Sequence, residues 1–474
     1  MTAGPAPAEP ASRPAGDPPE GDWPMWGGRP SRNMVAAETR LPTAWDVTER
    51  TNVRWIANLG TQTFGNPVVS GGKVFIGTNN GRPRNPRIKG DKGVLMCFSA
   101  QDGRFLWQAV HDKLPAGDAQ DWADIGVCST PCVTGDRVYY VSNRGELVCA
   151  DTEGFADGEN DGPFRDEQHA GPADADVVWS LDMLAVLGVI PLNASASSPL
   201  VVGERVFVVT GNGVDDAEGK VTTPQAPSFI AVDRNTGKVL WGSNAPGDRI
   251  LAGQWSSPAY GVVKGEPQVC FPGGDGWVYA FAPADGRMLW KFNCKAAERP
   301  PEKGEPETRN HIVAAPVYYE DRVFIAVGQD PESGDGPGAL WAIDATGRGD
   351  VTATGERWRL AGKDFGRSIS TVAVRDGLLY AVELGGYLNC IEAATGKRFW
   401  RHDLNAHVWG SPLLAGDKVC VTNEDGAVSI FAHGREARLL ATVAMPETLY
   451  CTPVLAGGVL YLADRSRLYA IAEP

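Results

Sequence analysis

The stretch Phe229–Trp241, FIAVDRNTGKVLW, decides the fold. Apolar residues alternate with smaller or polar ones on both sides of Asp233–Gly237, which predicts two short strands joined by a tight turn. Glycine supplies the positive φ that such a turn requires, and Asp and Asn side chains stabilise turns by bonding the local backbone. An isolated hairpin of this size is only marginally stable in water, so its stability must come from further strands.

A larger unit that contains this hairpin recurs from Gly65 onward. Each copy opens with a small residue, in most cases followed by proline, and continues through two apolar strands, a third strand, an Asp/Gly turn and a fourth strand that carries Trp. The eight openings are Asn66-Pro67, Thr130-Pro131, Ser198-Pro199, Ser257-Pro258, Ala315-Pro316, Thr371-Val372, Ser411-Pro412 and Thr452-Pro453. The fourth-strand tryptophans are Trp107, Trp179, Trp241, Trp290, Trp358 and Trp400, and the seventh unit has Leu440 at this place.

The two ends of the chain complete each other. The eighth unit stops after its third strand, which ends at Ile471, and an orphan strand with Trp55 precedes the first unit. We therefore predict an all-β fold, an eight-bladed β-propeller of four-stranded antiparallel blades, whose last blade is closed by the N-terminal strand. This closure removes the open sheet edges that promote aggregation.

The chain divides into three regions. Residues 1–21 are rich in Pro and Ala and predict a disordered leader, residues 22–51 an extended packing segment, and residues 52–474 the propeller. The leader lacks the basic and apolar regions of a signal peptide. We expect a periplasmic or otherwise extracytoplasmic protein if an upstream signal was removed or is missing, and a cytoplasmic one if Met1 is the true start.

Composition excludes several classes of function. The 474 residues carry a net charge of −14, which argues against binding to nucleic acid. No apolar run reaches the roughly 18 to 20 residues of a transmembrane segment. The nine cysteines form no zinc or haem motif, so we expect buried thiols. Cys128 and Cys132 are the one close pair, and a disulfide between them remains an alternative.

The pattern A-x-D-x-x-T-G-x-x-x-W occurs at Ala231–Trp241, with looser copies at Ala280–Trp290 and Ile391–Trp400. It resembles the repeat of the PQQ-like β-propellers, a superfamily that includes quinoprotein alcohol dehydrogenases and BamB-type outer-membrane assembly lipoproteins. The resemblance covers residues 52–474. It implies that each blade's Trp docks on the neighbouring blade's turn, where its indole N–H reaches a carbonyl. The residues concerned are Trp55, Trp107, Trp179, Trp241, Trp290, Trp358 and Trp400.

The dehydrogenases of this superfamily imply a chemistry that the chain does not match. They stack a quinone between a disulfide of adjacent cysteines and a Trp, beside a calcium ion. This sequence has no Cys-Cys dipeptide and no haem motif, and the calcium ligands cannot be placed on it. We therefore expect no cofactor and no metal, with PQQ and calcium as the alternative.

Residues just before each opening come from loops at the mouth of the central channel. Polar, aromatic and titratable side chains converge there, which is typical of a ligand site. Alternatively, each one solvates the channel or caps a strand. The candidates are Gln62, Asp124, Asn193, Gln254, Trp255, Asn310, His311, Arg367, His407, Trp409 and Tyr450.

Long loops elaborate the same face over blades one to five, whereas the acidic loop 153–176 lies on the other side. Loops on a rigid scaffold commonly carry binding function. The sequence therefore favours a non-catalytic, monomeric binding or scaffold protein that recognises a protein partner or a small polar ligand at the channel mouth. The alternative is a quinone- or metal-dependent oxidoreductase, similar to an alcohol or sugar dehydrogenase, that uses the central funnel.

Overall fold

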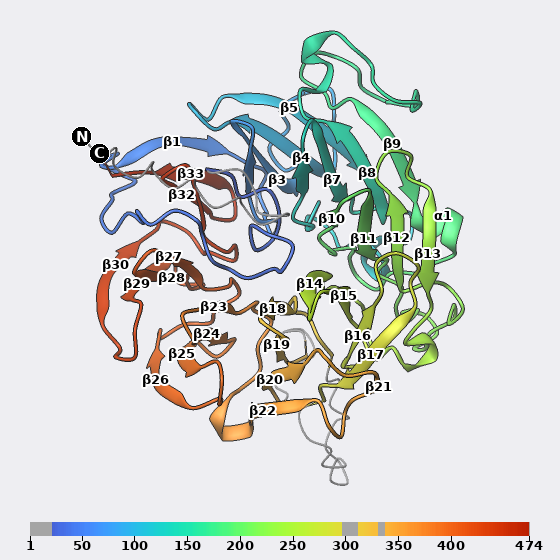
Figure 1. The fold of residues 1–474 in the computed structure, drawn as a ribbon. Helices are drawn as coiled ribbons and strands as arrows, with labels where there is room; N and C mark the ends of the chain where they lie inside the picture. Colours follow the sequence, from blue (N-terminus) through green and yellow to red (C-terminus); the bar gives the residue numbers. More distant parts are fainter. Residues whose placement is uncertain (1–20, 296–310, 330–336, 474) are drawn as a thin grey trace, which may run out of the picture.

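The computed structural model describes residues 21–295, 311–329 and 337–473, in which eight sheets form a ring of blades around a central axis (Figure 1). The eight-bladed β-propeller predicted from the repeats is confirmed. In each blade the first strand is innermost and hydrogen bonds link the strands outward in order. Of the predicted leader, 1–21, only Gly21 lies within the described residues.

The blades follow the chain. Blade one consists of β2 (Val68–Ser70), β3 (Lys73–Asn79), β4 (Lys92–Ser99) and β5 (Phe105–Asp112), and blade two of β6 (Cys132–Thr134), β7 (Arg137–Val141), β8 (Glu146–Asp151) and β9 (Val177–Asp182). Blade three consists of β10 (Leu200–Val202), β11 (Arg205–Val209), β12 (Phe229–Asp233) and β13 (Val239–Ser243), and blade four of β14 (Ala259–Val263), β15 (Glu266–Pro272), β16 (Trp277–Phe281) and β17 (Met288–Asn293).

The second half repeats the arrangement. Blade five consists of β18 (Val317–Tyr319), β19 (Arg322–Val327), β20 (Ala339–Asp344) and β22 (Glu356–Ala361), and blade six of β23 (Ala373–Arg375), β24 (Leu378–Glu383), β25 (Tyr387–Glu392) and β26 (Arg398–Asp403). Blade seven consists of β27 (Leu413–Ala415), β28 (Lys418–Thr422), β29 (Ala427–Ala432) and β30 (Leu439–Ala444), and blade eight of β31 (Val454–Ala456), β32 (Val459–Ala463), β33 (Arg467–Ile471) and β1 (Val53–Asn58).

Helices are few and short. The structure has α1 (Met183–Leu187) and the 3-10 helices Gly117–Ala119, Gly154–Asp157, Gly247–Arg249 and Gly362–Asp364. Within the described ranges, none has the length and apolar character that crossing a membrane would require.

The ring closes as predicted. Strand β1 pairs antiparallel with β33, so that Trp55 lies opposite Ala470 and the N-terminal strand becomes the outer strand of blade eight (Figure 1). Because every blade then has a neighbouring blade on each side, the ring is closed around its circumference.

Tryptophans join the blades at the outer rim. Each predicted docking Trp lies opposite a small residue, Ala or Cys, of its own blade's third strand, which leaves room for the indole. Six of them donate their Nε1–H to a carbonyl in the next blade's third turn. The pairs are Trp55 with Ala100, Trp107 with Thr152, Trp179 with Arg234, Trp241 with Pro283, Trp358 with Ala393 and Trp400 with Gly434, at 2.9–3.0 Å.

The glycine of the repeated Thr-Gly turn belongs to this contact. Gly237 has φ +70°, and a Cβ there would lie 2.7 Å from the ring of Trp179. Glycine is therefore required twice, for the left-handed backbone and for the close approach of the indole from the preceding blade. The Asp233 carboxylate completes the turn by accepting hydrogen bonds from the Asn235 and Thr236 amides.

Blade four makes its rim contact through an intermediary. Trp290 donates to Oε1 of Gln268 in its own blade, and Nε2 of Gln268 donates to the Ala345 carbonyl of blade five, at 2.9 and 3.1 Å. The turn in blade five is lengthened and adds a short strand, β21 (Gly349–Asp350), parallel to β17. The insertion thus adds a fifth strand beside Trp290 at the outer edge of blade four.

In blade seven the structure corrects the prediction that Leu440 takes the place of the fourth-strand Trp. The register places Ala441, rather than Leu440, opposite third-strand Ile430, and Leu440 occupies the bulge, where it is 40 % exposed. In this blade the larger residue of the pair, Ile430, lies on the third strand and the smaller one, Ala441, on the fourth. Trp45 is buried and donates to Sδ of Met445, just after β30, at 3.3 Å.

Residues 22–38, here called the axial segment, cross one end of the central channel. Their backbone and side chains form hydrogen bonds with all eight blades, at or beside the innermost strand of each. The partners are Val69, Val133, Ser198 with Pro199, Tyr260, Tyr318, Val374, Leu414 and Gly457, in blade order. Because these contacts go all the way around the axis, and Trp26 lines a cavity in the channel, the axial segment covers the channel at this end.

Candidate functional site

A circle of small residues, here called the hydroxyl circle, surrounds the axis at the start of the innermost strands and is interrupted between Ser257 and Ala315. These are the opening residues of the repeat, which precede proline in every blade except blade six, where Thr371 precedes Val372. In most blades the backbone N–H donates to the side-chain oxygen of the corresponding residue in the next blade: Thr130 to Ser198, Ser198 to Ser257, Ala315 to Thr371, Thr371 to Ser411, Ser411 to Thr452 and Thr452 to Asn66. The Asn66 side chain donates to Thr130 Oγ1 at 3.4 Å. Ala315 alone offers no oxygen to its neighbour, Ser257.

A cavity of about 720 Å³ lies above this circle, on the side of the channel mouth. Its size falls in the range of small-molecule sites. Trp26 of the axial segment belongs to its lining and donates Nε1–H to Thr371 Oγ1 at 3.2 Å, so it forms the floor. The cavity is therefore blind, with one end closed by the axial segment and the other bordered by the loops between blades.

Five aromatic side chains from these loops line the walls: Phe64, Trp122, Trp255, Trp409 and Tyr450. Phe64 stacks on Tyr450 with centroids 5.3 Å apart, and Trp409 meets the same ring edge-on at 5.2 Å. The indole N–H groups are held by the fold, because Trp255 donates to the Leu192 carbonyl and Trp409 to Glu424 Oε2. The rings are fixed, and their faces and edges remain available to a ligand.

The side chains that line the cavity are neutral, but the charged guanidinium of Arg32 lies directly beneath them. No Asp, Glu, Lys, Arg or His is among the described residues that line the cavity. Arg32 is fully buried, and its guanidinium donates to the carbonyls of Trp26, Ser198, Pro199 and Pro258, at 2.7–3.1 Å. Burial lowers the pKa of Arg32 to about 10, which still leaves it charged at neutral pH.

Four of the predicted mouth residues line the cavity: Asn193, Trp255, Trp409 and Tyr450. Asn193 has φ +64° and hydrogen-bonds through its backbone with Ala119 and Trp122, which places it beside the wall. Asn310 lies outside the described residues.

The other predicted mouth residues lie around the cavity. Gln254 is buried and bridges the Asn212 carbonyl and the Gly274 amide, at 2.7 and 3.1 Å. His311 is buried with its ring 5.5 Å from that of Trp255.

Four of them lie nearer the surface or in loops. His407 Nδ1 pairs with Glu424 Oε1 at 2.9 Å, and Gln62 accepts from Arg465 Nε at 3.0 Å. Arg367 and Asp124 use their backbone carbonyls as acceptors, for the Leu384 amide and the Asn79 side chain.

Sequence reasoning did not select the hydroxyl circle, Trp26 or Trp122. The signal for the circle was present, since a small polar residue recurs at the same position of the repeat, but it served only to mark strand starts. The cysteines are all without disulfide bonds, including Cys128, which lines the cavity, and Cys132. Burial raises the pKa of the Cys128 thiol to about 12, so it is not a thiolate at neutral pH.

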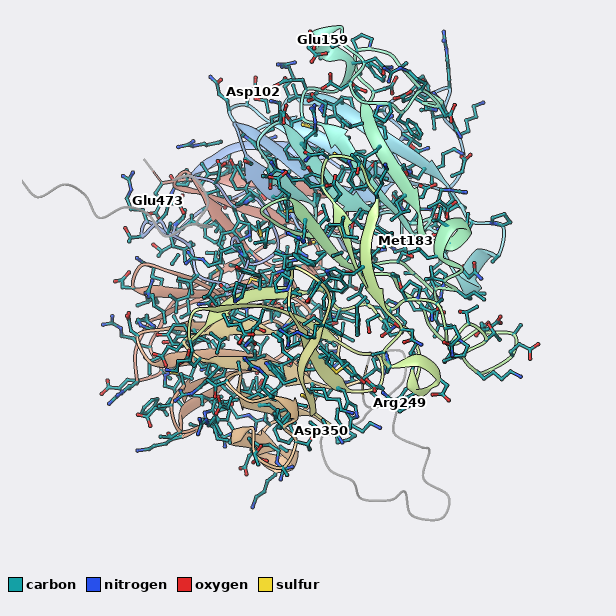
Figure 2. All side chains as sticks on the ribbon, turned by 45° about the vertical axis from the view of Figure 1, so that its right-hand side comes forward. Asp102, Glu159, Met183, Arg249, Asp350 and Glu473 are labelled. Atoms are coloured by element: carbon teal, nitrogen blue, oxygen red, sulfur yellow. The ribbon has the colours of Figure 1, made fainter. Side chains whose placement is uncertain are left out.

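A second cavity of about 300 Å³ lies between blades one and two, beside the acidic loop 153–176. Figure 2 shows Glu159 of this loop at the outer edge of the molecule. His111 lies 2.9 Å from Tyr140 Oη through Nε2 and 3.3 Å from Glu146 Oε2 through Nδ1. Burial raises the pKa of Glu146, but the hydrogen bond and charge of His111, with further polar neighbours, outweigh it and lower the pKa to about 2. These contacts tie the two blades together.

The family model described as outer membrane protein assembly factor BamB matches residues 44–154, 169–351 and 274–472. The chain belongs to this family of PQQ-like propellers. Proteins of curated function gave no match. The BamB family assignment agrees with the blade repeat and with the Trp contacts of the rim.

Solved structures share the fold at low identity. BamB from Moraxella catarrhalis is similar over 88 % of this chain and 96 % of its own, at 14 % identity and a TM-score of 0.52. The computationally designed Ika8 protein is similar over 88 % and 99 %, at 11 % identity and a TM-score of 0.53. Quinohemoprotein alcohol dehydrogenase from Comamonas testosteroni aligns over 96 % and 81 %, at 12 % identity and a TM-score of 0.49. These likenesses concern the fold, which does not determine function.

The described residues do not fit a quinone held with calcium. Calcium takes about six to eight oxygen ligands, with carboxylates among them. None of the cavity-lining residues is a carboxylate, and no group of three or more His, Cys, Asp and Glu in the described ranges could hold a metal ion. We therefore derive no redox step for this cavity.

Proposed function

We propose that this protein is a non-catalytic binding or scaffold protein, and that its central cavity is the binding site. The observation that carries the proposal is the blind cavity of about 720 Å³, walled by aromatic side chains from several blades. Among the described residues, its lining offers neither paired acids nor an activated nucleophile for catalysis. It does offer fixed apolar faces beside polar groups, the usual chemistry of a ligand pocket.

We propose an extracytoplasmic location, a protein or small-ligand partner at the channel mouth, and a monomeric state without cofactor. The description of the family model, an outer membrane assembly factor, supports a role in an assembly outside the cytoplasm. Light scattering after size exclusion tests the monomer, and cell fractionation tests the location.

Calorimetric titration with 2-naphthylmethanol, a neutral aromatic alcohol, tests the cavity. We expect saturable one-to-one binding to the wild type. Trp409→Ala should weaken it about five- to tenfold, since one wall is lost. Leu440→Ala, on the exposed bulge of blade seven, is the matched control and should bind as the wild type does. If the wild type shows no binding, or if both variants behave alike, the cavity is not the site.

A separate assay tests the non-catalytic assignment. The protein is incubated with PQQ and calcium, and dye reduction is followed with alcohols and sugars. We expect no turnover, because no carboxylate is among the lining residues that the structure describes. Stoichiometric quinone binding with turnover would establish the oxidoreductase instead.

A further inference from the structure

Hydroxyl groups of the circle accept hydrogen bonds from the protein and keep their protons for a ligand in the cavity. The oxygens of Ser198, Ser257, Thr371 and Thr452 accept backbone N–H groups, and Thr130 Oγ1 accepts the Asn66 amide. A hydroxyl has one proton to donate in addition to its lone pairs. Within the described residues, none of these five hydroxyls donates to a protein acceptor, and all five line the cavity. The base of the cavity is thus a ring of O–H donors.

Arg32 adds a positive charge at the same place. Its Nη2 donates to the backbone carbonyl of Ser198 at 3.0 Å, and the hydroxyl of the same residue belongs to the circle. The guanidinium therefore lies next to the ring of hydroxyl donors. All of its hydrogen-bond acceptors are carbonyls, and across the described ranges no carboxylate pairs with it. A buried charge without a counter-charge is costly, and an anion at the base of the cavity would offset that cost.

We propose that the cavity binds an organic carboxylate, with the carboxylate oxygens on the hydroxyl circle above Arg32 and an aromatic body between the walls. This proposal rests on the proposed function and names the ligand class of the same site. The single positive charge of Arg32 is balanced by the single negative charge of a carboxylate. A phosphate ester carries nearly two negative charges at pH 7 and would leave one of them uncompensated, so a carboxylate is favoured. Two carboxylate oxygens accept about four hydrogen bonds, so a carboxylate can use most of the five hydroxyl donors.

The test compares 2-naphthoate with 2-naphthylmethanol by calorimetric titration of the wild type at pH 7. We expect the acid to bind at least about tenfold more tightly, since its bonds to the hydroxyls are charge-assisted and Arg32 lies near. Equal affinities, or a preference for the alcohol, would overturn the carboxylate assignment and leave the cavity as a site. Binding of neither compound would overturn the proposed function itself.

Two serines of the circle provide a matched pair of variants. Ser198→Ala removes a hydroxyl that lines the cavity, and Ser411→Ala one that does not; each also removes the acceptor of one backbone N–H. We expect Ser198→Ala to weaken naphthoate binding about five- to tenfold, with the alcohol nearly unaffected. Ser411→Ala should leave both affinities unchanged. If the two variants weaken naphthoate binding equally, the effect comes from the circle's stability and the direct contact is wrong.

Discussion

The rim and the axis of this propeller hold the blades together by opposite means. At the rim, six blades repeat one contact, a Trp that donates to a carbonyl of the next blade. At the axis, the single axial segment bonds to every blade, and its residues follow no repeat. The rim can therefore vary in one blade without loss of the ring, as blades four and seven show, whereas the axial segment is a single element that serves all eight blades.

Removal of the axial guanidinium should have the largest effect. Arg32→Ala leaves four carbonyls, three of them in buried contacts, without their donor, and we expect the free energy of unfolding to fall by about 3 kcal/mol or more. Equilibrium urea unfolding measures the change, with Arg82→Ala on the exposed β3–β4 loop as the control. A loss no larger than that of the control would mean that the axis is not the less tolerant region.

A rim glycine should have the next largest effect. Gly237→Ala combines left-handed backbone strain with a clash against Trp179, and we expect a loss of about 2 to 4 kcal/mol. Gly203→Ala is matched to it, since φ is +58° with no atom within 4 Å of the added Cβ. That control should lose only about 1 kcal/mol. Equal losses in urea unfolding would show that backbone strain alone matters at this turn.

The polar contact between blades one and two predicts a pH dependence. The folded-state pKa of Glu146 lies below that of the unfolded chain, so its stabilisation is present above about pH 4.5 and is lost as the pH falls toward 2. Glu146→Gln should lower stability by about 1 to 2 kcal/mol at pH 7, and the difference from the wild type should shrink across this window. Unfolding curves recorded from pH 7 to pH 2.5 measure it; a constant difference contradicts the prediction.

The smallest expected effect is an increase in stability from a substitution in the hydroxyl circle. Ala315→Ser supplies the one oxygen missing from the circle, next to the Ser257 amide, and we expect about 1 kcal/mol of added stability. Ala314→Ser, one residue away and buried, adds the same group outside the circle and serves as the control. Thermal unfolding that ranks Ala314→Ser above Ala315→Ser would mean that the circle does not contribute as described.

The sequence sufficed for the ring because the ring is repetitive. Trp241 and Gly237 sit in a pattern that recurs, and the missing eighth strand could be assigned to Trp55 by counting. Blade seven shows a feature that the repeat pattern could not predict. A one-residue bulge moves Ala441 into the place expected for Leu440, and nothing in the local pattern reveals its pairing with Ile430.

The axis could not be predicted in the same way. The axial segment pairs mainly through its backbone with the inner edge of the strands, and such bonds leave no side-chain periodicity. Arg32 therefore reads as an ordinary surface residue in the sequence. Of the mouth residues, Trp255 and Tyr450 line the cavity, whereas Gln254 turns inward to bond backbone, because loop direction is set by tertiary contacts.

The closure by β1 has a consequence for biosynthesis. Residues 22–58 leave the ribosome before any blade is complete, yet Trp55 finds its partner only when Ala470 has been made. The first four hundred residues must therefore wait as an open arc with an unpaired edge, and this long-range pairing is slow to form. The nascent chain is most exposed to wrong association during that interval, and its final stability is acquired in one late step.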